Sequence, residues 1–287
     1  MKASANHSRE KLLTLTGAFK RQTRRLTLPR LLQGLALPIT IFVLWEILSG
    51  LGWLNVYLVP PPSQIWDRLL TVAGTGQLIR HISASLYRVV FGFGLALCLA
   101  LPLGFLLGLL PSMRGFISPS LSFFQQIPAI AWIPMFILWL GIDEASKIAI
   151  IVYSAFFPLF LNTLHGIAST DPKLKEVAYT YGLSYWGLIS RVYLPSAAPS
   201  VFVGMRLGLS YCWRSLVAAE LLGASKGIGY LIQEGREMAQ PDLILVGVFV
   251  IGLIGLSLDF IFRCLEQKFL PWQEKVDTNE VSKWQIS

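Results

Sequence analysis

Three ionisable side chains of this sequence lie inside one long apolar stretch, and they are the first candidates for chemistry. Arg206, Arg214 and Glu220 all fall within the run 199–222. Charges are costly inside a bilayer, and where they occur they mark pathways for ions or substrates or they pair with one another. Arg214 lies about 15 residues into the run. Its guanidinium presents a planar fork of donors that fits an oxyanion.

Two interpretations of Arg214 follow from the sequence. In the first, Arg214 attracts an anionic solute, with Ser210 one helical turn away on the same face. In the second, Arg214 is a structural ion-pair partner of one of three acids in apolar surroundings, Glu46, Glu220 or Asp259. The residue types alone do not separate these interpretations.

A second polar cluster interrupts the run 119–140, which combines two prolines with two amides. Proline removes a backbone donor, and within a membrane such breaks occur where neighbours or a water-lined cavity satisfy the freed groups. Interrupted helices commonly mark the pathway in transporters, although a plain proline kink gives the same pattern. The sequence therefore predicts a pathway lined by Gln125, Gln126, Trp132, Ser210 and Arg214.

Several classes of function lack their motifs. The sequence has no HExxH, GxSxG or phosphate-binding GxxxxGK[ST] motif, and its three histidines are far apart. We therefore expect neither an enzyme nor a metal site. The net charge of +8 is not gathered into the basic face that nucleic-acid binding needs. Cys98, Cys212 and Cys264 show no CxxC pairing and are expected to be free thiols.

Hydropathy predicts the elements that position these residues. The chain is 54% hydrophobic and 14% charged, whereas about 25% of residues are charged in an ordinary soluble domain. Six largely apolar runs are each long enough to cross a bilayer as a helix; they are 35–54, 89–110, 119–140, 147–166, 199–222 and 243–262. The predicted fold is an all-α integral membrane protein with about six transmembrane helices. In the second run, Gly104 and Gly108 form a GxxxG pattern that favours close helix packing.

The basic residues predict the orientation. The alternate loops that include both termini and the segment 168–199 hold 16 Lys and Arg, against 6 in the other loops. By the positive-inside rule, both termini and the segment 168–199 are cytoplasmic. The predicted segments are a basic N-terminal segment 1–34, a first transmembrane helix 35–54, an external amphipathic segment 55–88, a core domain 89–262 and a cytoplasmic tail 263–287. Residues 12–30 fit either a helix on the inner membrane face or a flexible basic tail.

The cytoplasmic loop has the pattern of two short soluble helices. Asp171 followed by proline predicts a helix start, because Asp caps and proline needs no donor at the first helical position. Gly182 fits the left-handed residue that ends a helix. Ser184 is expected to cap a second helix, which Leu194 and Pro195 would end.

The spacing within this loop resembles a known family. Glu176-Val177-Ala178 is followed after three residues by Gly182 and, after nine more, by Val192-Tyr193-Leu194-Pro195. This pattern is similar to the EAA loop of bacterial ATP-binding-cassette importer permeases, with conservative departures at Val177 and Val192. The resemblance extends over nearly the whole chain beyond the basic N-terminus. It is nearest to the branch of aliphatic sulfonate, taurine, nitrate and bicarbonate permeases, and the turn from Leu140 to Glu144 looks most like the sulfonate members.

The resemblance implies a type I importer permease (MetI-like) bundle in the inner, or cytoplasmic, membrane. It implies three partners besides the lipid bilayer: two copies of an ATPase that uses ATP and Mg, a second copy of this permease, and an external solute-binding protein. No cofactor is implied for this chain. The solute is expected to be a small anion, first an aliphatic sulfonate and alternatively nitrate, bicarbonate or taurine. A secondary transporter is the competing class; it should show paired repeats and coupling-ion carboxylates at mid-membrane. No repeat is seen in this sequence, and such a transporter would leave the EAA loop unexplained.

The resemblance also assigns roles within the loop. The residues implied to couple the permease to the ATPase are Glu176, Ala178, Tyr179, Gly182, Leu194 and Pro195. Periodicity adds an apolar stripe of Leu174, Val177, Ala178 and Tyr181. We expect this stripe to pack on the permease's own bundle while Glu176 and its neighbours face the ATPase.

Overall fold

A computed structural model describes residues 28–271, and the chain divides into two units at Val56. The predictions for residues 1–27 and for residues 272–287 lie outside the described residues. The first unit holds α2 (Leu28–Gly50), whose part from Ala36 onward is a short apolar helix. Gly52, at a φ of 75°, turns the chain after this helix, a backbone conformation that glycine adopts without strain.

The second unit begins at Tyr57 and is helical in all its described regular elements. These are α3 (Pro62–Gly74), α4 (Gln77–Leu109), α5 (Pro111–Gln125), η1 (Ala129–Trp132), α6 (Ile133–Leu140), α7 (Glu144–Ala168), α8 (Pro172–Thr180), α9 (Tyr185–Leu188), η2 (Ile189–Tyr193), α10 (Leu194–Gly223), α11 (Ile228–Glu237) and α12 (Pro241–Phe269). The predicted all-α class is confirmed.

The long apolar helices correspond to the predicted membrane runs. By length and composition, α4, α7 and α12 can each cross a membrane. Two bent pairs raise the number to as many as five: α5 with the segment 129–140, bent by 81°, and the segment 185–223 with α11, bent by 40°. Together with the shorter apolar helix of α2, they match the six predicted runs.

Two boundaries differ from those expected. The helix α4 starts at Gln77 rather than near residue 89, so the polar residues before the second run continue the same helix. The helix α5 starts at Pro111 rather than near residue 119. Hydropathy missed this start because residues 111–118 include Arg114 and other non-apolar residues, whereas proline at the first position suits a helix start.

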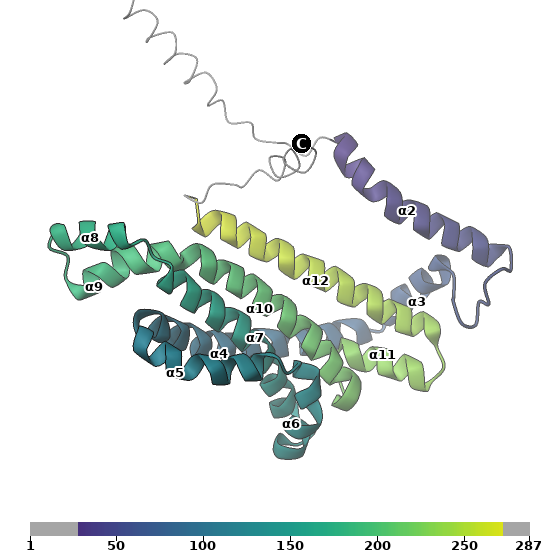
Figure 1. The fold of residues 1–287 in the computed structure, drawn as a ribbon. Helices are drawn as coiled ribbons and strands as arrows, with labels where there is room; N and C mark the ends of the chain where they lie inside the picture. The colour runs from purple at the N-terminus through teal and green to yellow at the C-terminus, as the bar shows by residue number, and fades with distance from the viewer. Residues whose placement is uncertain (1–27, 272–287) are drawn as a thin grey trace, which may run out of the picture. The chain divides into compact units, whose positions relative to one another are not determined.

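The core of the second unit lies around α7, which packs between α4 and α10 (Figure 1). Small residues make the approach close. A Cβ on Gly104 would lie 2.8 Å from the Phe160 carbonyl oxygen, and one on Gly108 would lie 2.7 Å from the Ile167 Cβ. The predicted GxxxG packing is therefore confirmed, with α7 as the neighbour. On the other side, a Cβ on Gly204 would lie 2.7 Å from the Asn162 Cβ.

This core separates two ends of the bundle. The helices α8 and α9 connect the end of α7 to the start of α10, whereas α6 precedes the start of α7 and α11 follows the end of α10. Because α7 and α10 pack side by side along their length, α8 and α9 lie at one end of the bundle, and α6 and α11 lie at the other (Figure 1).

Candidate functional site

The loop after α7 begins with the helix that the sequence predicts. The Asp171 side chain accepts a hydrogen bond from the Lys173 backbone N–H at 2.8 Å, and Pro172 occupies the first helical position. At the other end of α8, Gly182 has a φ of 67°. Its N–H donates to Tyr179 O at 3.0 Å, and the next N–H donates to Ala178 O at 3.1 Å. This pair of bonds is a Schellman motif, so the predicted role of Gly182 as the end of the helix is confirmed.

The second part of the loop differs from the prediction. Ser184 does cap α9, because its Oγ accepts from the Gly187 N–H at 3.3 Å. However, Leu194 and Pro195 do not end the helical segment; the chain passes through the π turn η2 directly into α10. Pro195 therefore lies within a continuous helical segment, just after the π turn, where the regular α-helical hydrogen-bond pattern that proline cannot complete is already interrupted.

The apolar stripe of α8 is the main correction in this loop. Of its four residues only Ala178 is buried, at 4% exposure, whereas Leu174, Val177 and Tyr181 are 48%, 52% and 81% exposed. The expected packing of the whole stripe on the permease's own bundle is wrong, because α8 is short and meets mainly η2. These exposed side chains instead line a groove of about 750 Å³, whose other wall includes Val192 and Pro195.

The other predicted loop residues are accessible as well. Glu176, Tyr179, Leu194 and Pro195 are exposed, as are the neighbouring Tyr185 and Trp186 rings. Contiguous exposed apolar surface rimmed by polar groups is typical of a protein interface. The loop therefore offers a partner an apolar groove as well as the carboxylate of Glu176.

A second site lies between α10 and the break after α5. A cavity of about 580 Å³ is lined by residues of three segments: the break (Gln125, Ile127, Pro128, Ala129, Ile130), α7 (Tyr153, Ser154, Phe157, Pro158, Leu161, Asn162) and α10 (Leu207, Tyr211, Arg214, Ser215, Ala218). Two of the five predicted pathway residues, Gln125 and Arg214, lie here.

The other three predicted residues do not line this cavity. Gln126 is exposed and Ser210 is half-buried on α10. Trp132 packs among aromatic rings, with centroids of Phe136 and Tyr153 at 6.1 and 5.8 Å. Sequence reasoning found the polar break but could not tell which of its residues face inward.

Arg214 is the one charged residue among the described cavity-lining residues. Two of the acids that were candidates to neutralise it have other partners. Glu220 binds Arg88 at 2.6 Å, and Asp259 binds Arg206 at 2.7 Å. Within the described part of the second unit, Arg214 makes no ion pair, and the other polar residues that line the cavity are neutral.

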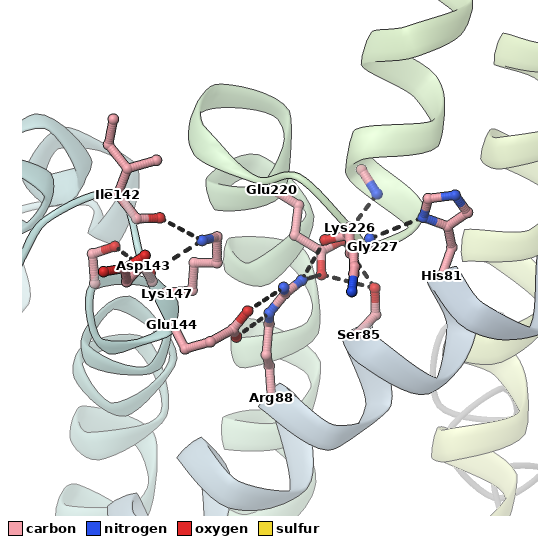
Figure 2. Close-up of polar contacts among 12 residues, drawn as sticks. His81, Ser85, Arg88, Ile142, Asp143, Glu144, Lys147, Glu220, Lys226 and Gly227 are labelled. Carbon is pink, nitrogen blue, oxygen red and sulfur yellow. Dashed lines mark hydrogen bonds and ion pairs between the residues drawn. The ribbon is translucent and has the colours of Figure 1, made fainter.

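A third cluster, missed by the sequence reasoning, joins four helices (Figure 2). It lies at the starts of α7 and α11 and the end of α10, the end of the bundle opposite α8. Arg88 of α4 is buried and donates to Glu220 of α10 at 2.6 Å and to both oxygens of Glu144 of α7 at 2.6 Å. Its guanidinium also donates to the Lys226 carbonyl oxygen at 2.7 Å. Arg88 thereby joins α4 to the starts of α7 and α11 and to the end of α10.

The same cluster fixes the turn before α11. Three consecutive backbone N–H groups donate to side chains: Gly227 to His81 Nδ1 at 3.1 Å, Ile228 to Ser85 Oγ at 2.9 Å, and Gly229 to Glu220 at 2.9 Å. His81 is thus hydrogen-bonded and buried, and no group of metal-ligating side chains occurs within residues 28–271. The spacing of His81, Ser85 and Arg88 at i, i+4 and i+7 was the signal that could have revealed this cluster.

Comparison with known proteins shows that the sequence is similar to transport proteins. Residues 100–271 match the family model described as "Binding-protein-dependent transport system inner membrane component". A Bacillus subtilis protein named as an aliphatic sulfonates transport permease is 37% identical over 86% of this chain and 89% of its own length. An Escherichia coli protein of the same designation is 35% identical over 86% and 94%. The taurine transport system permease protein of Escherichia coli is 32% identical over 82% and 88%.

Proposed function

Because the chain belongs to the family of inner membrane components of binding-protein-dependent transport systems, we propose that it forms the membrane pathway for a small anionic solute, an aliphatic sulfonate. As a member of this family it is the permease component of an ABC importer in the inner membrane. An ATPase partner handles ATP, and a binding protein is the second partner of such a system. Family membership also excludes the competing class of secondary transporter.

The observation that supports an anionic solute is the position of Arg214. It supplies the only charge among the described residues of the cavity between α10 and the break, and neutral donors such as Tyr211, Ser215 and Gln125 line the same cavity. A cationic fork with neutral hydroxyl and amide neighbours favours an oxyanion over a cation or an apolar solute.

The choice of sulfonate rests on the relatives. The three relatives described above, at 32–37% identity, are named for aliphatic sulfonates and for taurine, and both of these solutes carry a sulfonate group. Nitrate and bicarbonate are the alternatives, since a guanidinium also binds small planar oxyanions. Competition between these solutes for uptake by the importer would distinguish a sulfonate from nitrate or bicarbonate as the substrate.

We further propose that α8 and the groove beside it bind the ATPase. In this proposal Glu176, Tyr179 and Leu194 contact the ATPase directly. Ala178, Gly182 and Pro195 maintain the shape of the loop in this proposal: Ala178 is buried, Gly182 has a positive φ, and Pro195 lies just after η2. The complete importer would contain two copies of this permease and two of the ATPase, with both termini in the cytoplasm.

The test is uptake of a radiolabelled alkanesulfonate by the complete importer in proteoliposomes. We expect Arg214→Gln to lower the uptake roughly 10- to 100-fold, because a hydrogen bond to a charged group contributes about 1.5–3 kcal/mol. Arg114→Gln, at an exposed position outside the cavity, is the matched control and should transport normally. Unchanged uptake by Arg214→Gln, with normal assembly, would contradict the proposed anion pathway.

A further inference from the structure

One hydroxyl of α7 lies at the point where the helix from residue 111 to residue 140 is broken. The Tyr153 Oη donates to the Phe124 carbonyl oxygen at 2.6 Å and lies 3.3 Å from the Ile127 carbonyl oxygen. The break itself bends the chain by 81° between α5 and the segment 129–140. Tyr153 therefore contacts the backbone at the joint between two helical segments.

The chemistry of proline explains why a donor is needed there. In a continuous helix the Phe124 carbonyl would accept from the N–H of residue 128, but Pro128 has no N–H. The Phe124 oxygen accepts instead from the Ile127 N–H at 3.1 Å and from Tyr153. The Ile127 carbonyl has lost its usual partner too, because the Ala131 N–H donates to Pro128 O at 2.9 Å.

The two helices joined by this contact differ in how firmly they are packed: α7 lies in the core of the unit, whereas α5 does not. Tyr153 belongs to the central helix α7, where the neighbouring Ile151 is fully buried and a Cβ on Gly92 of α4 would lie 2.7 Å from its Cγ2. By contrast, α5 has no buried residue. Within residues 111–128, the hydrogen bonds of Tyr153 are the only ones that a side chain of another described helix makes to this segment.

The joint also borders the proposed pathway. Gln125, Ile127 and Pro128 line the cavity that holds Arg214, and so does Tyr153. A change in the bend at this joint would move Gln125 relative to Arg214 and alter the width of the cavity.

We propose that Tyr153 is a positioning residue that sets the bend of the broken helix by replacing the donor that Pro128 lacks. Its single hydroxyl proton serves one carbonyl at a time, so the Phe124 and Ile127 oxygens define two settings of the joint. The role in transport rests on the proposed function, whereas the hydrogen-bond role does not.

The test measures accessibility at Gln125→Cys in the complete importer, in membrane vesicles without solute or nucleotide. The exposed Cys98 and Cys264 are replaced by serine, and the buried Cys212 is kept. A membrane-impermeant maleimide should label Gln125→Cys about fivefold faster when Tyr153→Phe is added, since a net hydrogen bond contributes about 1 kcal/mol. The control Tyr211→Phe removes a hydroxyl of the same cavity that makes no hydrogen bond to a described residue, and it should leave the rate within twofold.

A double-mutant cycle separates this role from general loosening. Pro128→Ala restores a backbone N–H at the break, so Tyr153→Phe should change the labelling rate less than twofold in that background. A rate within twofold of the parent in Tyr153→Phe alone, or an undiminished effect in the Pro128→Ala background, would overturn the proposal. Because labelling requires no transport, either result is independent of whether Arg214 binds the solute.

Discussion

Arg88 is a single side chain on which four segments of the second unit depend. Arg88 and Glu220 are 2% and 1% exposed, so the pair is removed from solvent, whereas the Glu144 side chain is 54% exposed. Burial of one charge is tolerated only while its partner is present, and removal of one member leaves the other uncompensated. The Arg88–Glu220 pair is therefore expected to be a point of high sensitivity to substitution.

We predict that Arg88→Met destabilises the protein by about 3–5 kcal/mol, because Glu220 would be left buried without its cation. Adding Glu220→Gln should recover part of this loss, since the amide is uncharged and its oxygen can still accept from the Gly229 N–H. The measurement is the unfolding midpoint of the purified protein in mixed micelles titrated with SDS. Arg80→Met, at an exposed position nearby, should stay within about 0.5 kcal/mol of the parent. A double variant less stable than Arg88→Met would contradict the ion-pair account.

Single residues also show what sequence patterns can and cannot predict. The polarity of Arg214 and Gln125 inside apolar runs was enough to predict that they share a pathway, and the structure brings both to one cavity. The pairing of Arg88 with Glu220 joins residues 132 positions apart. The spacing of His81, Ser85 and Arg88 places them on one face of α4 but does not identify Glu220 as the partner, which appeared only with the packing of α4 on α10.

At the scale of elements, α8 shows which features depend on neighbouring residues in the sequence and which depend on tertiary packing. The Asp171 cap and the left-handed Gly182 were predictable, because a helix end is decided by a few neighbouring residues. The stripe of Leu174, Val177, Ala178 and Tyr181 was correctly placed on a helix, but periodicity says only that residues share a face. What covers that face depends on the neighbours, and here α8 leaves most of the stripe open to a groove.

This exposure leads to a prediction for the loop. Val177→Asp should leave the free energy of unfolding within about 0.5 kcal/mol of the parent, because the side chain is already exposed. It should nevertheless reduce co-purification of the ATPase at least roughly tenfold, since an unpaired carboxylate in an apolar contact costs more than about 1.4 kcal/mol. Both quantities are measured on the same membrane preparation.

Two controls make the result specific to the groove. Ala178→Asp puts the same charge at a buried position and should lower stability as well as binding. Ser112→Asp adds the charge at an exposed position in α5 and should affect neither quantity. Full ATPase recovery with Val177→Asp would show that the apolar groove is not the docking surface and that Glu176 and its neighbours suffice.

For the whole molecule, hydropathy predicted the number of apolar helical runs correctly but placed the starts of two helices wrongly. Every predicted apolar run has a helical counterpart, because a span of about 20 apolar residues is a property of the bilayer rather than of a particular fold. The predicted starts of α4 and α5 were too late in the sequence. Both helices begin with segments that contain polar residues, at Gln77 and at Pro111, and hydropathy does not detect such segments. The break at Pro128 was predictable from the sequence, but the hydrogen bond of Tyr153 to the backbone at this break was not.

The uneven charge of the loops gives the last prediction, the orientation of the second unit. The loop with α8 belongs to the set of segments holding 16 basic residues and the turn before α11 to the set holding 6, so they should lie in the cytoplasm and outside, respectively. The two loops are at opposite ends of the bundle (Figure 1), as this assignment requires. In a chain with Cys98 and Cys264 replaced by serine, Lys226→Cys should react with an impermeant maleimide in intact spheroplasts. Lys173→Cys should react only after the membrane is permeabilised. The opposite pattern would place α8 outside, where it could not meet a cytoplasmic ATPase, and would refute the proposed coupling role of the loop.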